Sequence, residues 1–313
     1  AMVLVVFVAI FAFYTSQAPS ASPASIIKDG GKYVQLKDGR YLEYFCFGDT
    51  SGQHKHTMIE FNGFGCSAYS LTHYFSDLYQ SMGIRTIAIT IPGFGYSTEL
   101  ADRELSRWHL DVEEVLKQED ITGKIWLKGS SFGTSHAMEV AAALGADRVN
   151  GLIVSGSIIP YTEALTLTPE KAQMPPKFLT TGVVGNMFWF LISKLAPTTI
   201  DYQPNFTSLF EKYPQFHDVM TLDMKRGQNH FGWVHNMDLI ARPWGFELDA
   251  LKDIRTWVIY DKEDELAPYE HSLWLADKIS ARLIEIQGFG HASILDLELF
   301  SPVIRTIFDE SQQ

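Results

Sequence analysis

The chain has 313 residues, 46% of them hydrophobic, so it is long enough and apolar enough to bury the core of one large domain or two small ones. Its net charge of −12 and its pI near 5.3 argue against a nucleic-acid-binding surface, because such surfaces depend on clusters of Lys and Arg, which the sequence lacks. Cys46 and Cys66 are its only cysteines, so a disulfide framework and a cysteine-rich zinc site are excluded, and we expect two buried thiols.

The N-terminal segment differs in composition from the rest of the chain. Residues 1–14 are an unbroken apolar run, and residues 15–25 are rich in Ser, Ala and Pro, as flexible tethers are. As a helix the apolar run would span about 21 Å, less than the ~30 Å hydrocarbon layer of a bilayer. We expect residues 1–31 to lie outside the core, as a truncated signal peptide, a membrane anchor or an arm packed on the domain.

Membrane association through residues 1–14, or entry into the secretory pathway, is the favoured location, with the cytoplasm as the alternative. The glycosylation sequon at Asn205 is compatible with a lumenal location, although such tripeptides often arise by chance.

After the tether, two apolar stretches on either side of Lys37-Asp38-Gly39 predict an antiparallel hairpin over residues 32–48. Strands and amphipathic helices then alternate, which favours a mostly parallel sheet with helices on both faces. The expected strands lie at 57–63, 84–93, 124–130, 149–157, 254–261 and 281–290, and the expected helices at 68–83, 99–119, 135–146, 269–279 and 292–309.

Residues 160–247 interrupt this alternation with prolines, aromatic residues and short helical stretches, and they are too many for a connecting loop. We interpret them as an inserted, mainly helical cap. The core then consists of residues 32–159 and 248–313.

The stretch Gly129-Ser130-Ser131-Phe132-Gly133 predicts a sharp turn between a buried strand and an Ala-rich helix. A turn that exposes a nucleophile in this way needs an unusual backbone, and side chains two positions before and after the nucleophile would collide with the strand and the helix. Ser131 has glycines at both of those positions, whereas Ser130 has Lys128 and Phe132. Ser131 is therefore the candidate nucleophile.

Several segments together resemble the α/β-hydrolase superfamily, and the resemblance covers residues 32 to 310. Residues 91–97 resemble the glycine-rich turn after the fourth strand of that family, residues 242–268 its approach to the acid loop, and residues 287–293 its histidine loop. The resemblance implies the α/β-hydrolase fold and a serine, acid, histidine order along the chain.

A serine hydroxyl needs a base with a pKa near neutrality, and His291 is the favoured candidate among ten histidines. It follows a strand in a glycine-rich turn, just before the last helix. Packing or surface positions are expected for five others, while two in the cap can line the pocket or face water. These are His54, His56, His73, His109 and His136 in the first group and His230 and His235 in the second.

The imidazole needs a carboxylate to orient it and to stabilise its cation. In the family the acid loop commonly reads Gly-x-x-Asp-x-x-x-Pro, and Asp264 with Pro268 resembles that pattern, whereas Asp261 stands where the glycine would be. We favour Asp264, with Asp261 as a second carboxylate that assists it, replaces it or is merely solvated.

Two backbone amides are expected to form the oxyanion hole. One belongs to Phe132, the residue after the nucleophile. The other, implied by the resemblance, belongs to Phe64 in the glycine-rich stretch 61–67, which has Asn62 and Gly65 where the family commonly has His and Pro. Cys66 is expected to be a small apolar filler.

Aromatic residues of the cap predict an apolar pocket, with Phe64 and Trp233 as the substrate-binding candidates. The pattern calls for no metal and no organic cofactor. His54 and His56 lack a third ligand, and residues 93–98 lack the last glycine of a dinucleotide fingerprint.

The predicted function is hydrolysis of carboxylic esters with apolar acyl or aryl groups, through Ser131, His291 and Asp264 and an acyl-enzyme. Alternatives with the same three residues are C–C bond hydrolysis, thioester cleavage and acyl transfer. Outside enzymes, the alternatives are a ligand-sensing receptor and a membrane-tethered scaffold without turnover. The oligomeric state stays open.

Overall fold

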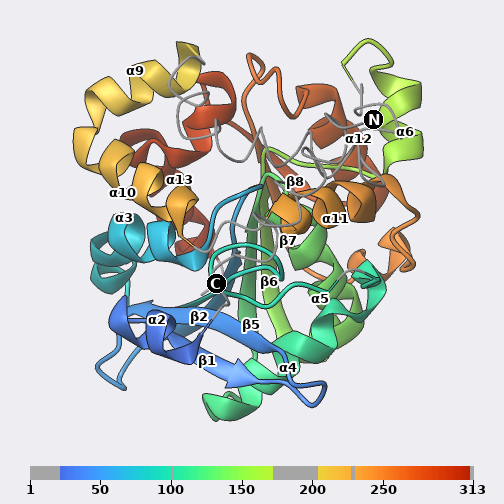
Figure 1. Ribbon diagram of the computed structural model, residues 1–313. Coiled ribbons are helices and arrows are strands. Elements are labelled where there is room, and N and C mark those ends of the chain that lie inside the picture. The colour runs from blue at the N-terminus through green and yellow to red at the C-terminus, as the bar shows by residue number, and fades with distance from the viewer. Residues whose placement is uncertain (1–21, 101, 172–203, 227–229, 311–313) are drawn as a thin grey trace, which may run out of the picture.

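The computed structural model describes residues 22–100, 102–171, 204–226 and 230–310. Within them, strands form one eight-stranded sheet in the order β1-β2-β4-β3-β5-β6-β7-β8, which runs through the middle of the molecule (Figure 1). The β1-β2 and β2-β4 pairs are antiparallel, and every other neighbouring pair is parallel. The strands are β1 (Lys32–Gln35), β2 (Tyr41–Gly48), β3 (His56–Phe61), β4 (Ile84–Ile89), β5 (Ile125–Ser130), β6 (Val149–Ser155), β7 (Thr256–Tyr260) and β8 (Arg282–Glu285).

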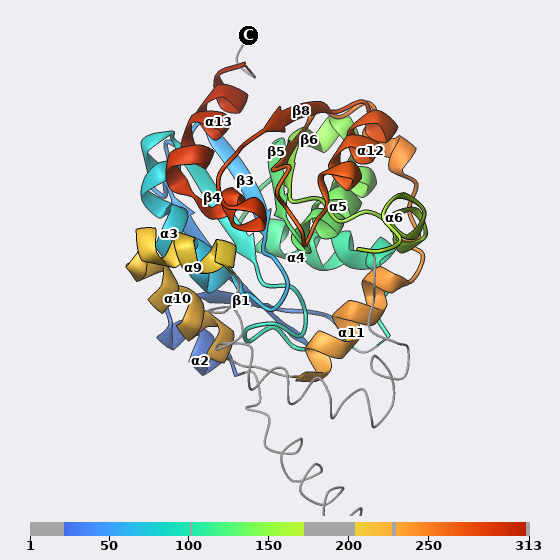
Figure 2. The ribbon, with the colours of Figure 1, turned by 90° about the horizontal axis from the view of Figure 1, so that it is seen from above.

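Helices cover both faces of the sheet, as the alternation of strands and helices predicted. One face packs against α3 and α13, and the other against α4, α5 and α12 (Figures 1 and 2). All six residues of β5 are buried because helices lie over both of its sides, while β8 at the edge is mostly exposed. These helices are α3 (Ala68–Ser81), α4 (Trp108–Gln118), α5 (Gly133–Arg148), α12 (Tyr269–Ile279) and α13 (Leu297–Glu310).

Local sequence explains the bounds of α3. Ser67 is the N-cap, and its hydroxyl accepts a hydrogen bond from the amide of Tyr69 at 3.2 Å. After the C-cap Met82, the chain leaves the helix through Gly83, whose φ of +67° is readily adopted only by glycine. The helix therefore delivers the chain directly into β4.

The described part of the 160–247 insertion is helical and lies above the carboxyl ends of the parallel strands. Figure 2 shows α10 beside α3 and α6 beside α12, with α9 packed on α10 and α11 apart from both. Residues 172–203 and 227–229 of the insertion lie outside the described residues. The helices are α6 (Tyr161–Leu167), α9 (Pro204–Lys212), α10 (Pro214–Lys225) and α11 (His230–Ala241), and η3 (Leu248–Leu251) follows them.

Three local expectations differ from the structure. The helix expected over 99–119 begins only at η1 (Leu105–Arg107), and the helix expected over 292–309 is divided at Asp296 into η4 (Gly290–Leu295) and α13. Asp296 accepts hydrogen bonds from the amides of Glu298 and Leu299, so it caps a new helix rather than continuing the old one.

The third difference concerns the end of the expected tether. Residues Pro23–Lys28 form α2, whose Ile26 is buried, and the chain then enters β1 at Lys32. Both cysteines are free thiols. Cys66 is buried, as expected, but Cys46 is only half-buried. The Cys46 Sγ atom lies 3.7 Å from Glu119 Oε2.

Among the described residues, no helix is long and apolar enough to span a bilayer. Residues 1–14, on which the expected membrane association depends, lie outside the described residues, so that expectation stays a prediction.

Candidate active site

Ser131 stands at the end of β5 in a strained turn. Its φ is +52°, a value that non-glycine residues rarely adopt, and its amide donates to the carbonyl of Ser155 on β6 at 2.8 Å. A Cβ at Gly129 would lie 2.4 Å from the carbonyl oxygen of Gly133, and a Cβ at Gly133 would lie 2.3 Å from that of Phe61. The two glycines are therefore required by close packing, as the sequence argument predicted.

Ser131, His291 and Asp264 form a continuous chain of hydrogen bonds. His291 Nε2 lies 2.9 Å from Ser131 Oγ, and His291 Nδ1 lies 2.7 Å from Asp264 Oδ2. Because an ionised carboxylate only accepts hydrogen bonds, this arrangement puts the imidazole proton on Nδ1 and leaves Nε2 to accept from the serine hydroxyl. Asp264 is 3% exposed, so its interaction with His291 is shielded from water.

Asp264 and Asp261 hold different partners in the loop after β7. Asp264 accepts the amides of Leu266 and Ala267 through its other oxygen, at 2.9 and 2.8 Å, which fixes the carboxylate toward His291. Asp261 instead accepts from the amide of Gly288 at 3.1 Å and from the hydroxyl of Ser293 at 2.5 Å. Asp261 thus ties the acid loop to the histidine loop and makes no hydrogen bond to the imidazole.

Where the structure describes their side chains, the other histidines that the sequence analysis considered make no hydrogen bond to Ser131, His291 or Asp264. His54 bonds to Thr57, His56 begins β3, His73 donates to the carbonyl of Tyr69, His109 pairs with Glu139, and His136 is buried against Arg103. In the cap, His235 pairs with Glu99, and the side chain of His230 lies outside the described residues, as does that of Asn205.

The loop that follows β3 carries Phe64 beside the nucleophile. A Cβ at Gly63 would lie only 3.4 Å from Ser131 Cβ, so the backbone of this loop approaches the serine closely. The Asn62 amide group donates to Ser67 and Ser70, and so holds the loop in shape from inside. Phe132 is the N-cap residue of α5, where the first backbone amides lack acceptors within the helix.

The cap helix α10 also holds this loop. Asp223 accepts from the amide of Ser67 at 2.9 Å and from its hydroxyl, and Arg226 donates to the same hydroxyl at 2.8 Å. Arg226 bonds further to Glu43 at 2.7 Å and to Asp29 at 2.8 Å. Burial raises the pKa of both Asp223 and Glu43.

The sequence analysis did not identify two charged residues that lie beneath the elbow. The isolated acid and base inside the apolar stretches 57–63 and 124–130 were a usable signal, because unpaired charges are rarely buried. They are Glu60 and Lys128, which form a fully buried ion pair beneath the elbow, with the ammonium 5.2 Å from the ring centroid of Phe75.

A cavity of about 260 Å³ opens at Ser131 and His291. Its walls are mainly apolar and come from the core and the cap; both Phe64 and Trp233, expected to bind substrate, line it, and their ring centroids are 5.1 Å apart. Cys66 lines it as an apolar filler, and burial raises the pKa of its thiol far above the usual range. The remaining lining residues are Asn62, Gly63, Ser70, Leu71, Phe75, Ser130, Phe206, Phe216, Met220, Met224, Leu266, Ile294 and Leu295.

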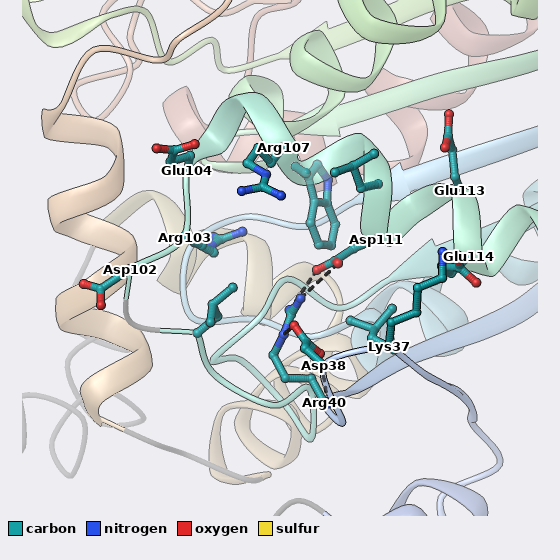
Figure 3. A pocket seen from close by; sticks show the side chains of 14 residues that line it. Lys37, Asp38, Arg40, Asp102, Arg103, Glu104, Arg107, Asp111, Glu113 and Glu114 are labelled. Carbon is teal, nitrogen blue, oxygen red and sulfur yellow. Dashed lines mark hydrogen bonds and ion pairs between the residues drawn. The ribbon is translucent and has the colours of Figure 1, made fainter.

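A second cavity, of about 520 Å³, lies between the β1-β2 turn, Leu100, residues 102–104 and α4. Figure 3 shows its charged walls, with the Arg40 guanidinium pointing at the carboxylate of Asp111. Arg40 donates to Asp111 at 2.8 and 3.0 Å and to Asp38 at 2.7 Å, and Lys37 lies 3.2 Å from Glu114. Half of the charged residues in these walls are thus paired with one another.

Within residues 22–100, 102–171, 204–226 and 230–310, no group of three or more His, Cys, Asp or Glu side chains is arranged to hold a metal ion. The chemistry that the described residues of the first cavity can perform is that of an activated alcohol beside an imidazole.

Comparisons with known proteins identify the family of the chain. Residues 61–300 match the model of the alpha/beta hydrolase family. No curated protein matches the chain.

Solved structures resemble the fold over most of the chain. A thermophilic esterase from Thermogutta terrifontis, determined with malate bound, is 17% identical, with a TM-score of 0.68 over 90% of this chain and 99% of its own. A bromoperoxidase from Bacillus anthracis is 16% identical, with a TM-score of 0.69 over 89% of this chain and 99% of its own. An esterase from Exiguobacterium antarcticum is 17% identical, with a TM-score of 0.64 over 90% of this chain and 100% of its own. At these identities the likeness establishes the fold alone. Together with the match of the family model, it establishes that the chain belongs to the alpha/beta hydrolase family.

Proposed function

We propose that the protein is a serine hydrolase that cleaves carboxylic esters with small apolar acyl or aryl groups. The observation that carries the proposal is the hydrogen-bonded chain from Asp264 through His291 to Ser131 at the wall of a mainly apolar cavity. The esterases among the structural neighbours are consistent with it.

The reaction would begin with attack of Ser131 Oγ on the ester carbonyl carbon. His291 Nε2 takes the serine proton as the bond forms, and Asp264 stabilises the imidazolium and keeps its Nδ1 proton in place. The carbonyl oxygen becomes negatively charged, and the amides of Phe64 and Phe132 are proposed to donate to it.

Collapse of the tetrahedral intermediate transfers the proton from His291 to the leaving alcohol and leaves the acyl group on Ser131. Water then attacks the acyl-enzyme, with His291 as the base, and the carboxylic acid is released. Neither step needs a metal or an organic cofactor.

The cavity volume supports small substrates. At about 260 Å³ it lies just below the usual range of roughly 300–1,000 Å³ for small-molecule sites. Its aromatic and methionine side chains offer apolar contact, and among the described residues no lysine or arginine lines it to bind a multiply charged acid.

A fluorophosphonate probe tests the nucleophile. We expect labelling of the wild-type protein and none of Ser131→Ala, while Ser106→Ala, whose hydroxyl lies on η1 away from the cavity, is labelled as the wild type is. Absence of labelling in folded wild-type protein would contradict the proposal.

Hydrolysis of p-nitrophenyl esters of increasing acyl length tests the reaction. We expect multiple turnover with a preference for short acyl chains, because a cavity of about 260 Å³ excludes long ones. Labelling without turnover of any ester or thioester would instead favour a ligand-sensing receptor.

A further inference from the structure

Ser130 lines the same cavity as Ser131, although the two residues are neighbours in the chain. In a strand their side chains would point to opposite faces. The positive φ of Ser131 turns the chain at this point, and both residues line one cavity. Consecutive Cα atoms are about 3.8 Å apart. Ser130 therefore lies close to the ester carbon that Ser131 is proposed to attack.

The hydrogen bonds around Ser130 determine which way its proton points. Lys128 Nζ lies 3.4 Å from Ser130 Oγ and only donates, so it uses one lone pair of that oxygen. Ser155 Oγ lies 3.0 Å from Ser130 Oγ, and Ser155 is 0% exposed. In the described part of the chain, the Ser155 hydroxyl contacts no hydrogen-bond partner besides Ser130.

A buried hydroxyl proton without an acceptor is costly, so Ser155 must donate to Ser130. Both lone pairs of Ser130 Oγ are then occupied, by the ammonium and by the Ser155 hydroxyl. The Ser130 proton is left to point into the cavity. Because its oxygen accepts from a charged donor, it is a stronger donor than an ordinary serine hydroxyl.

Two other polar side chains among the described residues of the cavity wall have their donors engaged. Asn62 donates to Ser67 and Ser70, and Ser70 donates to the carbonyl of Ser67 at 3.2 Å. Both are thus engaged within the wall.

We propose that Ser130 determines specificity by donating a hydrogen bond to an oxygen on the second or third carbon of the acyl group, so that ether-, keto- or hydroxyacyl esters are preferred over plain alkyl esters. This inference rests on the proposed ester hydrolysis. The acyl group is the relevant part of the substrate because it stays bound through both steps. An alkyl chain in its place would cover the Ser130 proton without offering it an acceptor.

Pairs of p-nitrophenyl esters that differ by oxygen for methylene test the proposal. They are methoxyacetate against butyrate and 3-methoxypropionate against pentanoate, in which the ether oxygen can only accept. We expect the ratio of kcat/KM within at least one pair to fall about tenfold to hundredfold in Ser130→Ala relative to the wild type, a comparison in which intrinsic ester reactivity cancels.

Two variants separate the hydrogen bond from general effects on the cavity. Ser70→Ala also removes a serine hydroxyl from the cavity wall and should leave the ratio as in the wild type. Ser155→Ala removes the donor that orients Ser130 and should give an intermediate ratio.

If the wild type hydrolyses plain esters but Ser130→Ala leaves the ratio unchanged in both pairs, or if Ser70→Ala lowers it as much, the inference is wrong and the proposed function survives. If the wild type hydrolyses no ester of either kind, the proposed function itself fails. An equal loss of activity by Ser130→Ala on both members of each pair would also overturn the inference, because it would point to a role in the chemistry rather than in specificity.

Discussion

The two cavities of this molecule differ in how their polar groups are arranged. The charged cavity beside α4 has about 520 Å³, twice the volume of the cavity at Ser131, but half of its charged residues are paired with one another across the surface. The cavity at Ser131 has few polar groups, and these converge from the ends of different strands. Hydrogen bonds that converge on one point therefore indicate the site where chemistry is expected, whereas the volume of a cavity and the number of its charges do not.

The origin of this difference lies in the sheet. Ser131 follows β5, Asp264 follows β7 and His291 follows β8, so all three leave the carboxyl ends of parallel strands at one edge. The charged cavity is formed instead by the antiparallel β1-β2 turn and a helix side, where long charged side chains pair in contact with water.

The largest effect is expected from Asp264→Asn, with Asp111→Asn as its matched control. Asp264→Asn keeps an oxygen for the Leu266 and Ala267 amides but presents an NH₂ group to His291, which moves the imidazole proton to Nε2 and prevents it from accepting the serine proton. We expect kcat for ester hydrolysis to fall about 10⁴-fold.

Asp111→Asn is the control in the charged cavity, where Asp111 also binds a single cation, Arg40. It should leave kcat/KM within about twofold of the wild type. Comparable losses in both variants, measured on folded protein, would remove the distinction between the two cavities.

The next effect concerns packing. Trp233 is 6% exposed and packs on Phe64 and over Gly65, so Trp233→Ala should lower the free energy of unfolding by about 3 kcal/mol and raise KM. Leu110→Ala removes an apolar side chain from the charged cavity, but Leu110 is 44% exposed, so about 0.5 kcal/mol or less is expected. Urea denaturation measures both, and equal losses would contradict the difference in packing.

The pH dependence of the free energy of unfolding should come from Glu139 on α5, which pairs with His109 on α4, the helix that lines the charged cavity. Burial raises the pKa of Glu139 to about 7 from an ordinary value of 4.5. Between these values the folded protein holds a proton that the unfolded chain has released, so the free energy of unfolding falls as pH rises through this range and levels off above it.

Glu139→Gln should therefore flatten the dependence of the free energy of unfolding on pH between about 4.5 and 7, by about 1 to 3 kcal/mol across the range. As a control, Asp147→Asn changes an exposed acid on α5, the helix that carries Glu139, and should not change the slope. Denaturant titrations at a series of pH values provide the test, and an unchanged slope in Glu139→Gln would show that another group is responsible.

The smallest effect is expected from the ion pairs of the charged cavity. Arg40→Met breaks the contacts to Asp38 and Asp111, and we expect a loss of about 0.5 to 1 kcal/mol that shrinks in 1 M salt, with no change in ester hydrolysis. A loss of activity would mean that this cavity takes part in the reaction.

Much of the fold could be predicted because its signals are local. Alternating apolar runs predicted the strands and the main helices, and the family model and the sheet confirm the α/β-hydrolase fold. Predictions of where helices begin and end were less accurate: Asp296 caps a new helix inside what reads as one amphipathic stretch, and the 99–119 pattern includes residues before η1 that are not helical. Periodicity locates a helix but is a weak guide to its ends.

The sequence favoured Asp264 as the acid after β7 but left the role of Asp261 open, because the two lie three residues apart and have the same chemistry. Loop geometry separates them: amides of Leu266 and Ala267 turn Asp264 toward His291, while Gly288 and Ser293 hold Asp261. The Lys128-Glu60 pair was missed because its members are 68 residues apart and are buried only through the pairing of β3 with β5.

The sequence by itself determined the elbow at Ser131, because the two glycines and the small residues around it are demands of local backbone and close packing. It also determined the order of strands and helices along the chain. Only the tertiary structure decided which carboxylate faces the imidazole, and that Ser130 lines the same cavity as Ser131. Those outcomes depend on hydrogen bonds between loops and strands distant in the chain, which no local pattern specifies.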